Sequence, residues 1–417
     1  MVHMRPPLLG AACGVMLLGA VLAGQAPLSA PLLERARTLM EKAPLIDGHN
    51  DLPWAMREAA RYDFTKVDIR RPQPALQTDI PRLREGRVGA QFWSVYVPPA
   101  LDGHGAVTAT LEQIDAVHEL ARRYPDVFEI ARTADDVERL FRSGKIASLI
   151  GMEGGHSIDN SLGALRMFHR LGARYMTLTH GDDTAWADSA TDTPRLGGLS
   201  PFGEAVVREM NWLGMLVDLS HVSPDTMKDA LRVSEAPVIF SHSSARALCN
   251  VPRNVPDEVL RLLPASGGVV MVTFVPSFVS QAVADYSNRL SEQAKTWAAD
   301  HADEAGRKAA RTAWVAANPP PTATLAQVAD HIDHVRAVAG IDHVGLGSDF
   351  DGIDAGPVGL EDVSTYPALV AELLRRGYGE EDVAKVLGGN VLRALRQAER
   401  VASRLQQSRP PSVLTLK

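Results

Sequence analysis

Short apolar runs rich in β-branched residues alternate with amphipathic stretches along most of this chain. Eight such runs occur, at residues 43–49, 88–97, 145–153, 173–180, 214–221, 236–242, 267–274 and 343–351. Continuous apolar runs are typical of strands in a parallel sheet that is buried on both faces. The pattern therefore predicts a parallel sheet whose strands are joined by helices.

The stretches between these runs have helical spacing. In the segment that begins at Ser223, this serine has the character of an N-cap and Pro224 suits the first helical position. Helices are predicted over 162–172, 223–234, 325–340, 366–377 and 380–402. Eight strands with intervening helices favour a (β/α)8 barrel.

Residues 284–322 interrupt this alternation, because they are rich in alanine and charge and close with three prolines. They predict a helical insertion between the seventh strand and its helix. Such an insertion either covers the catalytic face or forms a plain surface excursion. We expect residues 61–80 to form an extended loop, residues 31–405 to form the barrel domain and residues 406–417 to form a polar tail.

The first 30 residues differ from the rest of the chain. Arg5 precedes an apolar segment over residues 8–22, and small residues follow it. This layout is typical of a secretory signal peptide cleaved between residues 23 and 30. An uncleaved anchor fits less well because the apolar segment is short and rich in Gly and Ala. We expect an exported protein, periplasmic or secreted, with neither a lipid anchor nor a transmembrane helix after cleavage.

Composition narrows the chemistry. The 417 residues are 45% hydrophobic and 22% charged, as in a globular protein, and carry a net charge of −7. Without a stretch rich in Lys and Arg, nucleic acid is not an expected partner. Cys13 lies in the predicted signal peptide, which leaves Cys249 alone in the mature chain. An intrachain disulfide and a Cys-ligated zinc site are therefore excluded.

Candidate chemistry gathers at the ends of the predicted strands, which form the active site in this kind of barrel. Alone, each of these groups would pass for a structural residue, and the stretch around His49 would pass for a polar turn. Six of the eight strands nevertheless end in such groups: His49 with Asp51, Glu153, His180, His221, His242 and Asp349. This coincidence favours a metal site.

Imidazole and carboxylate groups without a thiolate suit Zn²⁺. Four or five ligands are too many for one catalytic zinc ion but suit two ions that share a carboxylate. Glu153, followed by two glycines, is the predicted bridge. Asp47 is expected behind the ligands or in the core. His156 either supports Glu153 or stabilises its loop by a hydrogen bond.

Several longer motifs resemble those of a known family. In order, they are DGHNDLPW, GMEGGHSI, LTH, DLSHVS, FSHSSA, RNVPDEVL and GSDFDG. From about residue 40 to about residue 400 the chain looks like the membrane (renal) dipeptidase family of zinc peptidases. The resemblance implies a (β/α)8 metallohydrolase that cleaves dipeptides with two zinc ions, in a family noted for tolerating a C-terminal D-residue.

The resemblance also implies a role for each residue. One zinc ion would be held by His49 and Asp51, the other by His221 and His242, with Glu153 as the bridge. A hydroxide between the ions would attack the peptide carbonyl.

The remaining roles concern the substrate. His180 would meet the scissile region, Arg253 would hold the terminal carboxylate, and Asp349 would transfer a proton. From composition alone, Arg253 would pass for an ordinary loop residue.

Two other functions are less consistent with the motifs. Other metal-dependent amidohydrolases usually carry His-x-His on strand one and often a bridging Lys on strand four. Here the first motif is His49-x-Asp51, and strand four ends in His180. A barrel that only binds peptides would be expected to lack a ligand or Asp349. The oligomeric state is not fixed by the sequence, and a homodimer is compatible with it.

Overall fold

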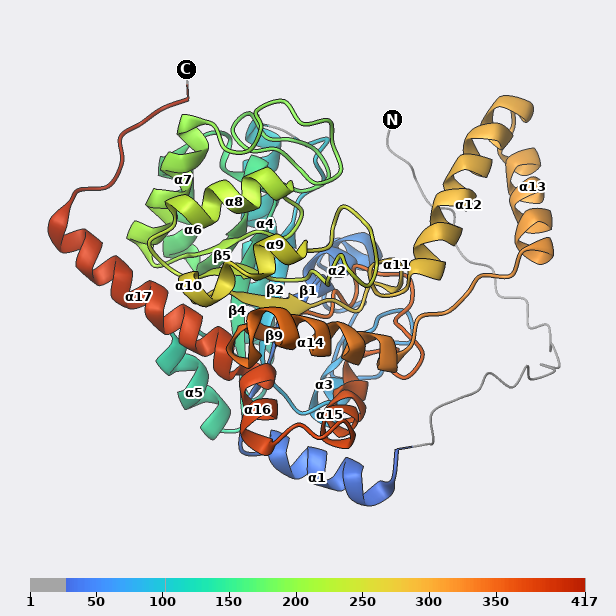
Figure 1. Cartoon of the computed structure of the whole chain (residues 1–417), viewed down its shortest axis with the longest axis horizontal. Coiled ribbons are helices and arrows are strands. Elements are labelled where there is room, and N and C mark those ends of the chain that lie inside the picture. Colours follow the sequence, from blue (N-terminus) through green and yellow to red (C-terminus); the bar gives the residue numbers. More distant parts are fainter. Residues whose placement is uncertain (1–27, 102, 417) are drawn as a thin grey trace.

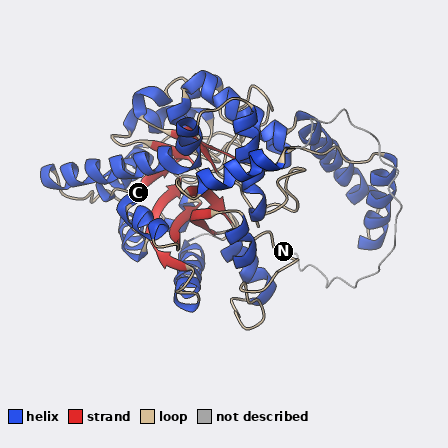
Figure 2. Cartoon of the chain, turned by 90° about the horizontal axis from the view of Figure 1, so that it is seen from below, coloured by secondary structure: helices blue, strands red, loops and turns tan. Residues whose placement is uncertain are grey.

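A closed parallel barrel forms the centre of the protein. The computed structural model describes residues 28–101 and 103–416. Within these residues one parallel sheet has the strand order β2-β1-β9-β8-β7-β6-β5-β4-β3, and pairing of β2 with β4 closes it. The strands are β1 (Leu45–Asn50), β2 (Val88–Tyr96), β3 (Phe128–Ile130), β4 (Ile146–Glu153), β5 (Ala173–Thr177), β6 (Leu216–Asp218), β7 (Val238–Phe240), β8 (Val269–Val272) and β9 (Val344–Leu346). All except β3 belong to the barrel, and helices surround it (Figures 1 and 2), which confirms the predicted (β/α)8 fold.

The eight predicted strands are all present, but several end earlier than predicted. The run 214–221, for example, gives only β6. There the Asp218 carboxylate accepts the backbone N–H of Ser220, at 3.1 Å, and the backbone N–H of Ser241, at 2.8 Å. These groups are thereby bound by a side chain instead of a neighbouring strand. The short β3, which was not predicted, pairs with the start of β4.

Helices connect the strands in chain order. They are α1 (Ala30–Met40), α2 (Leu52–Ala60), α3 (Ile80–Glu85), α4 (Gly103–Arg123), α5 (Ala134–Arg142), α6 (Leu162–Leu171), α7 (Pro201–Leu213), α8 (Pro224–Val233), α9 (Asp257–Leu260), α10 (Leu263–Ser266), α11 (Pro276–Val279), α12 (Gln281–Asp300), α13 (Glu304–Ala317), α14 (Leu325–Ala339), α15 (Tyr366–Arg375), α16 (Glu380–Ala384) and α17 (Asn390–Ser408). The 3₁₀ turns are η1 (Gly155–Ile158), η2 (Ile341–His343) and η3 (Val363–Thr365), and η4 (Lys385–Gly389) is a π turn. The predicted cap of α8 is confirmed, because the Ser223 side chain accepts from the backbone N–H of Thr226.

The predicted helix over 380–402 is divided by the π turn η4. At Gly388, an added Cβ would lie 2.5 Å from the carbonyl oxygen of Pro44. Only glycine lets the turn approach the start of β1 so closely. Beyond η4, apolar residues of α17 join those of the strands in one buried cluster, so α17 packs against the barrel.

The predicted insertion consists mainly of α12 and α13, which form a hairpin that stands out from the barrel (Figures 1 and 2). The two helices contact each other through aromatic rings, with centroids of Tyr286 and Trp314 5.3 Å apart and those of Trp297 and Trp314 6.2 Å apart. Among the described residues, none from α12 or α13 lines the cavity at the strand ends. This arrangement agrees with a surface excursion.

The predicted signal peptide lies, apart from its last three residues, outside the described residues. In the part that the structure describes, no helix has both the length and the apolar character needed to span a membrane.

Candidate active site

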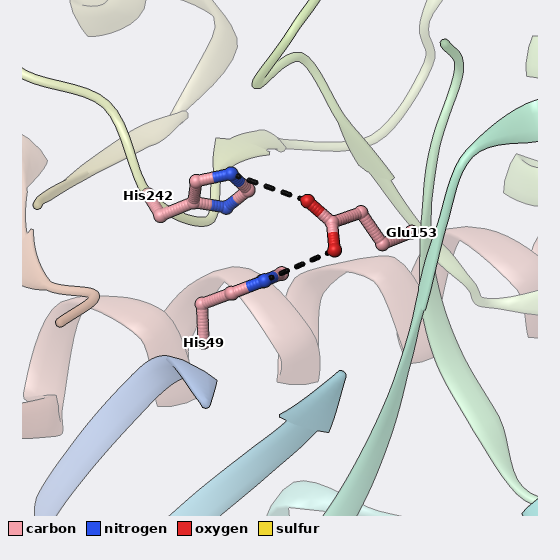
Figure 3. A group of neighbouring side chains, drawn as sticks. All are labelled: His49, Glu153 and His242. Atoms are coloured by element: carbon pink, nitrogen blue, oxygen red, sulfur yellow. Dashed lines mark ion pairs between the residues drawn. The ribbon is translucent and has the colours of Figure 1, made fainter. Parts of the chain in front are cut away.

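The predicted metal ligands converge on Glu153, the last residue of β4 (Figure 3). Its Oε2 lies 3.3 Å from Nε2 of His49, which belongs to β1. Its Oε1 lies 3.0 Å from Nε2 of His221 and 3.5 Å from Nε2 of His242, after β6 and β7. The two oxygens of one carboxylate thus face imidazoles from opposite sides of the barrel.

Asp51 and Asp349 complete the side of the site around His49. Asp51 follows β1, and its Oδ2 lies 3.3 Å from Nε2 of His49. Ligand atoms of His49, Asp51 and Asp349 all lie within 4.8 Å of one another. Asp349 and, on the other side, His221 have left-handed backbones, with φ of 70° and 68°. This conformation is costly for residues other than glycine and often occurs at functional sites.

Hydroxyl groups orient two of the imidazoles. The Tyr175 hydroxyl lies 2.9 Å from Nδ1 of His49 and donates to the carbonyl of Gly48. The Ser241 hydroxyl lies 2.8 Å from Nδ1 of His242 and donates to Asp218. In both cases the ring is held through Nδ1, which leaves Nε2 directed at Glu153.

Sequence reasoning missed these supporting residues, although part of the signal was available. In a strand every second side chain points into the barrel. The inward side of β5 therefore includes Tyr175 and Thr177, and Asp218 is a charged residue inside a buried run.

The donor set fits zinc. The buried polar atoms of the described residues that lack a hydrogen-bond partner include His49 Nε2 and Asp51 Oδ1, which are thus available to a metal ion. Burial, together with nearby positive charge, lowers the pKa of both His221 and His242 well below the usual range. Their rings are then neutral, which is the form that binds a metal.

Two further predicted residues line the cavity next to these ligands. Nε2 of His180, after β5, lies 3.7 Å from Oε1 of Glu153. Arg253 is buried, and its donors make only long contacts, 3.5 Å to the Ser243 hydroxyl and 3.4 Å to the carbonyl of His242. Burial lowers the pKa of Arg253 to about 10, so its guanidinium remains charged at neutral pH.

The cavity has a volume of about 480 Å³, enough for a small ligand. Its wall includes three of the predicted ligands, Asp51, Glu153 and His221, together with Asp349. It also includes aromatic residues that sequence reasoning did not select, Trp54, Tyr96 and Phe278. Burial, reinforced by the charge of Asp51, raises the pKa of Asp349 well above its usual range.

The two supporting residues left open by the sequence now have defined contacts. His156 hydrogen-bonds through Nε2 to the carbonyl of Val97, at 3.0 Å, in agreement with the loop-stabilising alternative. Asp47 is fully buried and accepts from the hydroxyls of Ser348 and Tyr366 and the amide of Gln91. It is a polar group of the core, as predicted.

Fold and site together define a metal-dependent hydrolase built on a (β/α)8 barrel. The family model for membrane dipeptidase (peptidase family M19) matches residues 33–409, and the chain belongs to this family of metallopeptidases. The predicted family resemblance is thereby confirmed.

Known relatives agree with this assignment. Dipeptidase 3 of Rattus norvegicus is 42% identical over 388 residues, which cover 92% of this chain and 71% of that protein; the Mus musculus protein is 43% identical over 387 residues, 92% of this chain and 70% of that one. Among solved structures, the probable dipeptidase PvdM from Pseudomonas aeruginosa superposes with a TM-score of 0.77 at 26% identity, covering 89% of this chain and 99% of that one. A metallo peptidase from Rhodobacter sphaeroides gives a TM-score of 0.70 at 27% identity, covering 85% and 99%.

Proposed function

We propose that this protein hydrolyses dipeptides with two zinc ions. His49 and Asp51 would hold one ion, His221 and His242 the other, with Glu153 shared between them. The observation that carries the proposal is the position of Glu153, whose two oxygens each face a different group of ligands. When bound, the ions supply a nucleophilic water at neutral pH and polarise the peptide carbonyl.

Arg253 would restrict the substrate to dipeptides. Its guanidinium is charged, buried and only weakly engaged with the protein, so its donors are free to bind a carboxylate in bidentate fashion. A dipeptide bound with its scissile bond at the metal ligands ends within one residue of that bond. A longer peptide would place a neutral amide against the guanidinium.

His180 and Asp349 would act on the reacting groups. His180 borders the cavity beside Glu153 and would donate a hydrogen bond to the carbonyl oxygen as negative charge develops on it. Asp349, whose pKa is raised by burial, is suited to take a proton from the attacking water and deliver it to the leaving amine.

Two finer features belong to the same proposal. The Rhodobacter sphaeroides relative was solved with a phosphinate mimic of the dipeptide L-Ala-D-Ala, which supports acceptance of a D-residue in the second position. The charged, apolar and small-residue segments at residues 1–30 support export.

The test begins with the chain from residue 31, purified and analysed for bound zinc. A panel of L,L- and L,D-dipeptides is then compared with the matching tripeptides. We expect two zinc ions per chain and cleavage of dipeptides alone. Fewer than two ions together with no dipeptide cleavage would overturn the proposal, and retained peptide binding without cleavage would instead indicate a binding protein.

A further inference from the structure

A second cavity, here called the basal cavity, lies at the opposite end of the barrel from the site. It has a volume of about 430 Å³ and is bordered by the ends of α6 and α7, the start of α5 and the side of α17. Its wall contains Arg132, His169 and Arg174. Arg174 lies near the start of β5, whereas His180 follows the end of the same strand, so the two cavities are separate.

Arg174 is an unusual residue for its position. Its side chain donates to the backbone carbonyls of Arg132, His169 and Ala173. Within the described residues, no carboxylate oxygen lies within 4.0 Å of its guanidinium nitrogens. Arginine is almost never buried unless a negative charge pairs with it. Here carbonyl oxygens accept from Nε and Nη1 without neutralising the charge, and Nη2 donates to none of the described residues.

Arg253 resembles Arg174 in its burial and in its lack of an ion-pair partner within the part of the chain that the structure describes. Of the arginines in the described residues, only Arg174 and Arg253 are buried, at 8% and 5% exposure. Both line a cavity, and neither has an ion-pair partner among the described residues. For Arg253 the proposed function supplies the missing negative charge from the substrate. Arg174 has the same need in a cavity that the proposed function does not use.

The surroundings increase the positive character of the basal cavity. Arg132 also lacks an ion-pair partner in the described residues, and burial with the charges of both arginines lowers the pKa of His169 to about 4. Glu399 is the acidic residue in the wall, and its Oε1 is occupied by the backbone N–H of Ala134, at 2.8 Å. Ser403 and Gln406 add neutral hydrogen-bonding groups on α17.

We propose that the basal cavity binds a small molecule through an oxyanion, a carboxylate or a phosphate, held by Arg174 and Arg132. Nη2 of Arg174 has N–H donors left for either anion, and the guanidinium of Arg132 can bind the same anion with two parallel N–H donors. The cavity is larger than the anion itself, so the bound molecule also carries a polar part that faces α17. This site is independent of dipeptide hydrolysis.

Isothermal titration of the zinc-loaded full chain with sodium phosphate, and separately with sodium acetate, tests the proposal. The substitutions Arg132→Gln and Arg174→Gln are compared with Arg170→Gln, which changes an exposed arginine at the end of α6 that does not line the cavity. We expect the affinity of the anion for the basal cavity to fall at least tenfold in Arg132→Gln and Arg174→Gln and to stay unchanged in Arg170→Gln. Binding of oxyanions at the catalytic cavity remains in all variants and serves as the internal reference.

The two anions distinguish the source of the ligand. If binding to the basal cavity is seen with phosphate but not with acetate, the ligand of this cavity carries a phosphate. If binding is seen with acetate, the ligand carries a carboxylate. Because the Arg132 side chain is exposed, Arg132→Gln is expected to fold even if Arg174→Gln does not. Identical isotherms for all four proteins, or an equal loss in Arg170→Gln, would overturn the proposal.

Discussion

Replacing Arg253 by alanine tests the proposed role of this residue in selecting dipeptides. The substitution removes a guanidinium that is 5% exposed and whose contacts inside the protein are 3.4 and 3.5 Å long. The protein therefore loses little of its own bonding, and the loss falls on the substrate carboxylate. Breaking one partner of a buried, hydrogen-bonded charge pair costs about 2 to 5 kcal/mol.

We expect a value in the middle of that range, because water can enter the open cavity and partly replace the guanidinium. A loss of about 3 to 4 kcal/mol corresponds to about a 100- to 1,000-fold lower kcat/KM. The zinc content should not change, since a guanidinium that stays positively charged is not a metal ligand.

The assay measures kcat/KM of the wild-type and Arg253→Ala enzymes, each on a dipeptide and on the C-terminal amide of that dipeptide. The amide lacks the charge that Arg253 is proposed to bind, so it should be a poor substrate for both enzymes to a similar degree. An equal fold-loss on dipeptide and amide would refute the assigned contact. Loss of zinc in the variant would show that Arg253 supports the metal site instead.

Three further predictions concern residues behind the site and in the core. Tyr175→Phe removes the hydroxyl 2.9 Å from Nδ1 of His49 and should weaken zinc binding about 10- to 100-fold, measured by competition with a chelator; unchanged affinity would contradict the orienting role. Asp47→Asn replaces a carboxylate that accepts several hydrogen bonds by an amide whose NH₂ group would face those same donors. The substitution should lower the free energy of unfolding by about 3 kcal/mol. A loss below about 1 kcal/mol in urea unfolding would contradict this role of Asp47. Burial lowers the pKa of His331 to about 4, whereas the same residue in the unfolded chain binds a proton below about pH 6.5. The free energy of unfolding should therefore fall by about 2 kcal/mol between pH 7 and pH 5 through this residue. In urea unfolding of the metal-free protein, this decrease should be smaller by that amount in His331→Gln but unchanged in a variant of the exposed His104.

The sequence carried enough information for the barrel and for the position of the site. Continuous apolar runs mark strands buried on both faces, and parallel strands bring their carboxyl ends together, so His49, Glu153 and His242 had to meet once the fold was correct. Strand length was harder to predict, because it depends on side chains such as Asp218 that bind backbone N–H groups of their own and the neighbouring strand end. The support of His49 by Tyr175 joins residues 126 positions apart, and no local pattern specifies that pairing.

One buried carboxylate shows how the barrel positions residues of the candidate site. Oδ1 of Asp47 accepts the N–H of His49, at 3.3 Å, and the N–H of Ser348, at 2.8 Å, while Oδ2 accepts the Ser348 hydroxyl, at 2.7 Å. These bonds tie β1 to the end of β9. The residue after Ser348 is Asp349, so the same carboxylate fixes the backbone on both sides of the His49–Asp349 group.

Asp218 repeats this arrangement across the barrel. Its Oδ1 accepts the N–H of Ser220, at 3.1 Å, and of Ser241, at 2.8 Å, and its Oδ2 accepts the Ser241 hydroxyl, at 2.6 Å. The residues that follow these two serines are His221 and His242. In both cases an aspartate binds an N–H two residues ahead, and then the N–H and hydroxyl of a serine that directly precedes a site residue on the neighbouring strand. Because each carboxylate accepts from groups on two neighbouring strands, it holds the two strand ends at a fixed separation. Within each half of the site, the spacing of the two strand ends is therefore set by the polar core of the barrel rather than by the loops around its mouth.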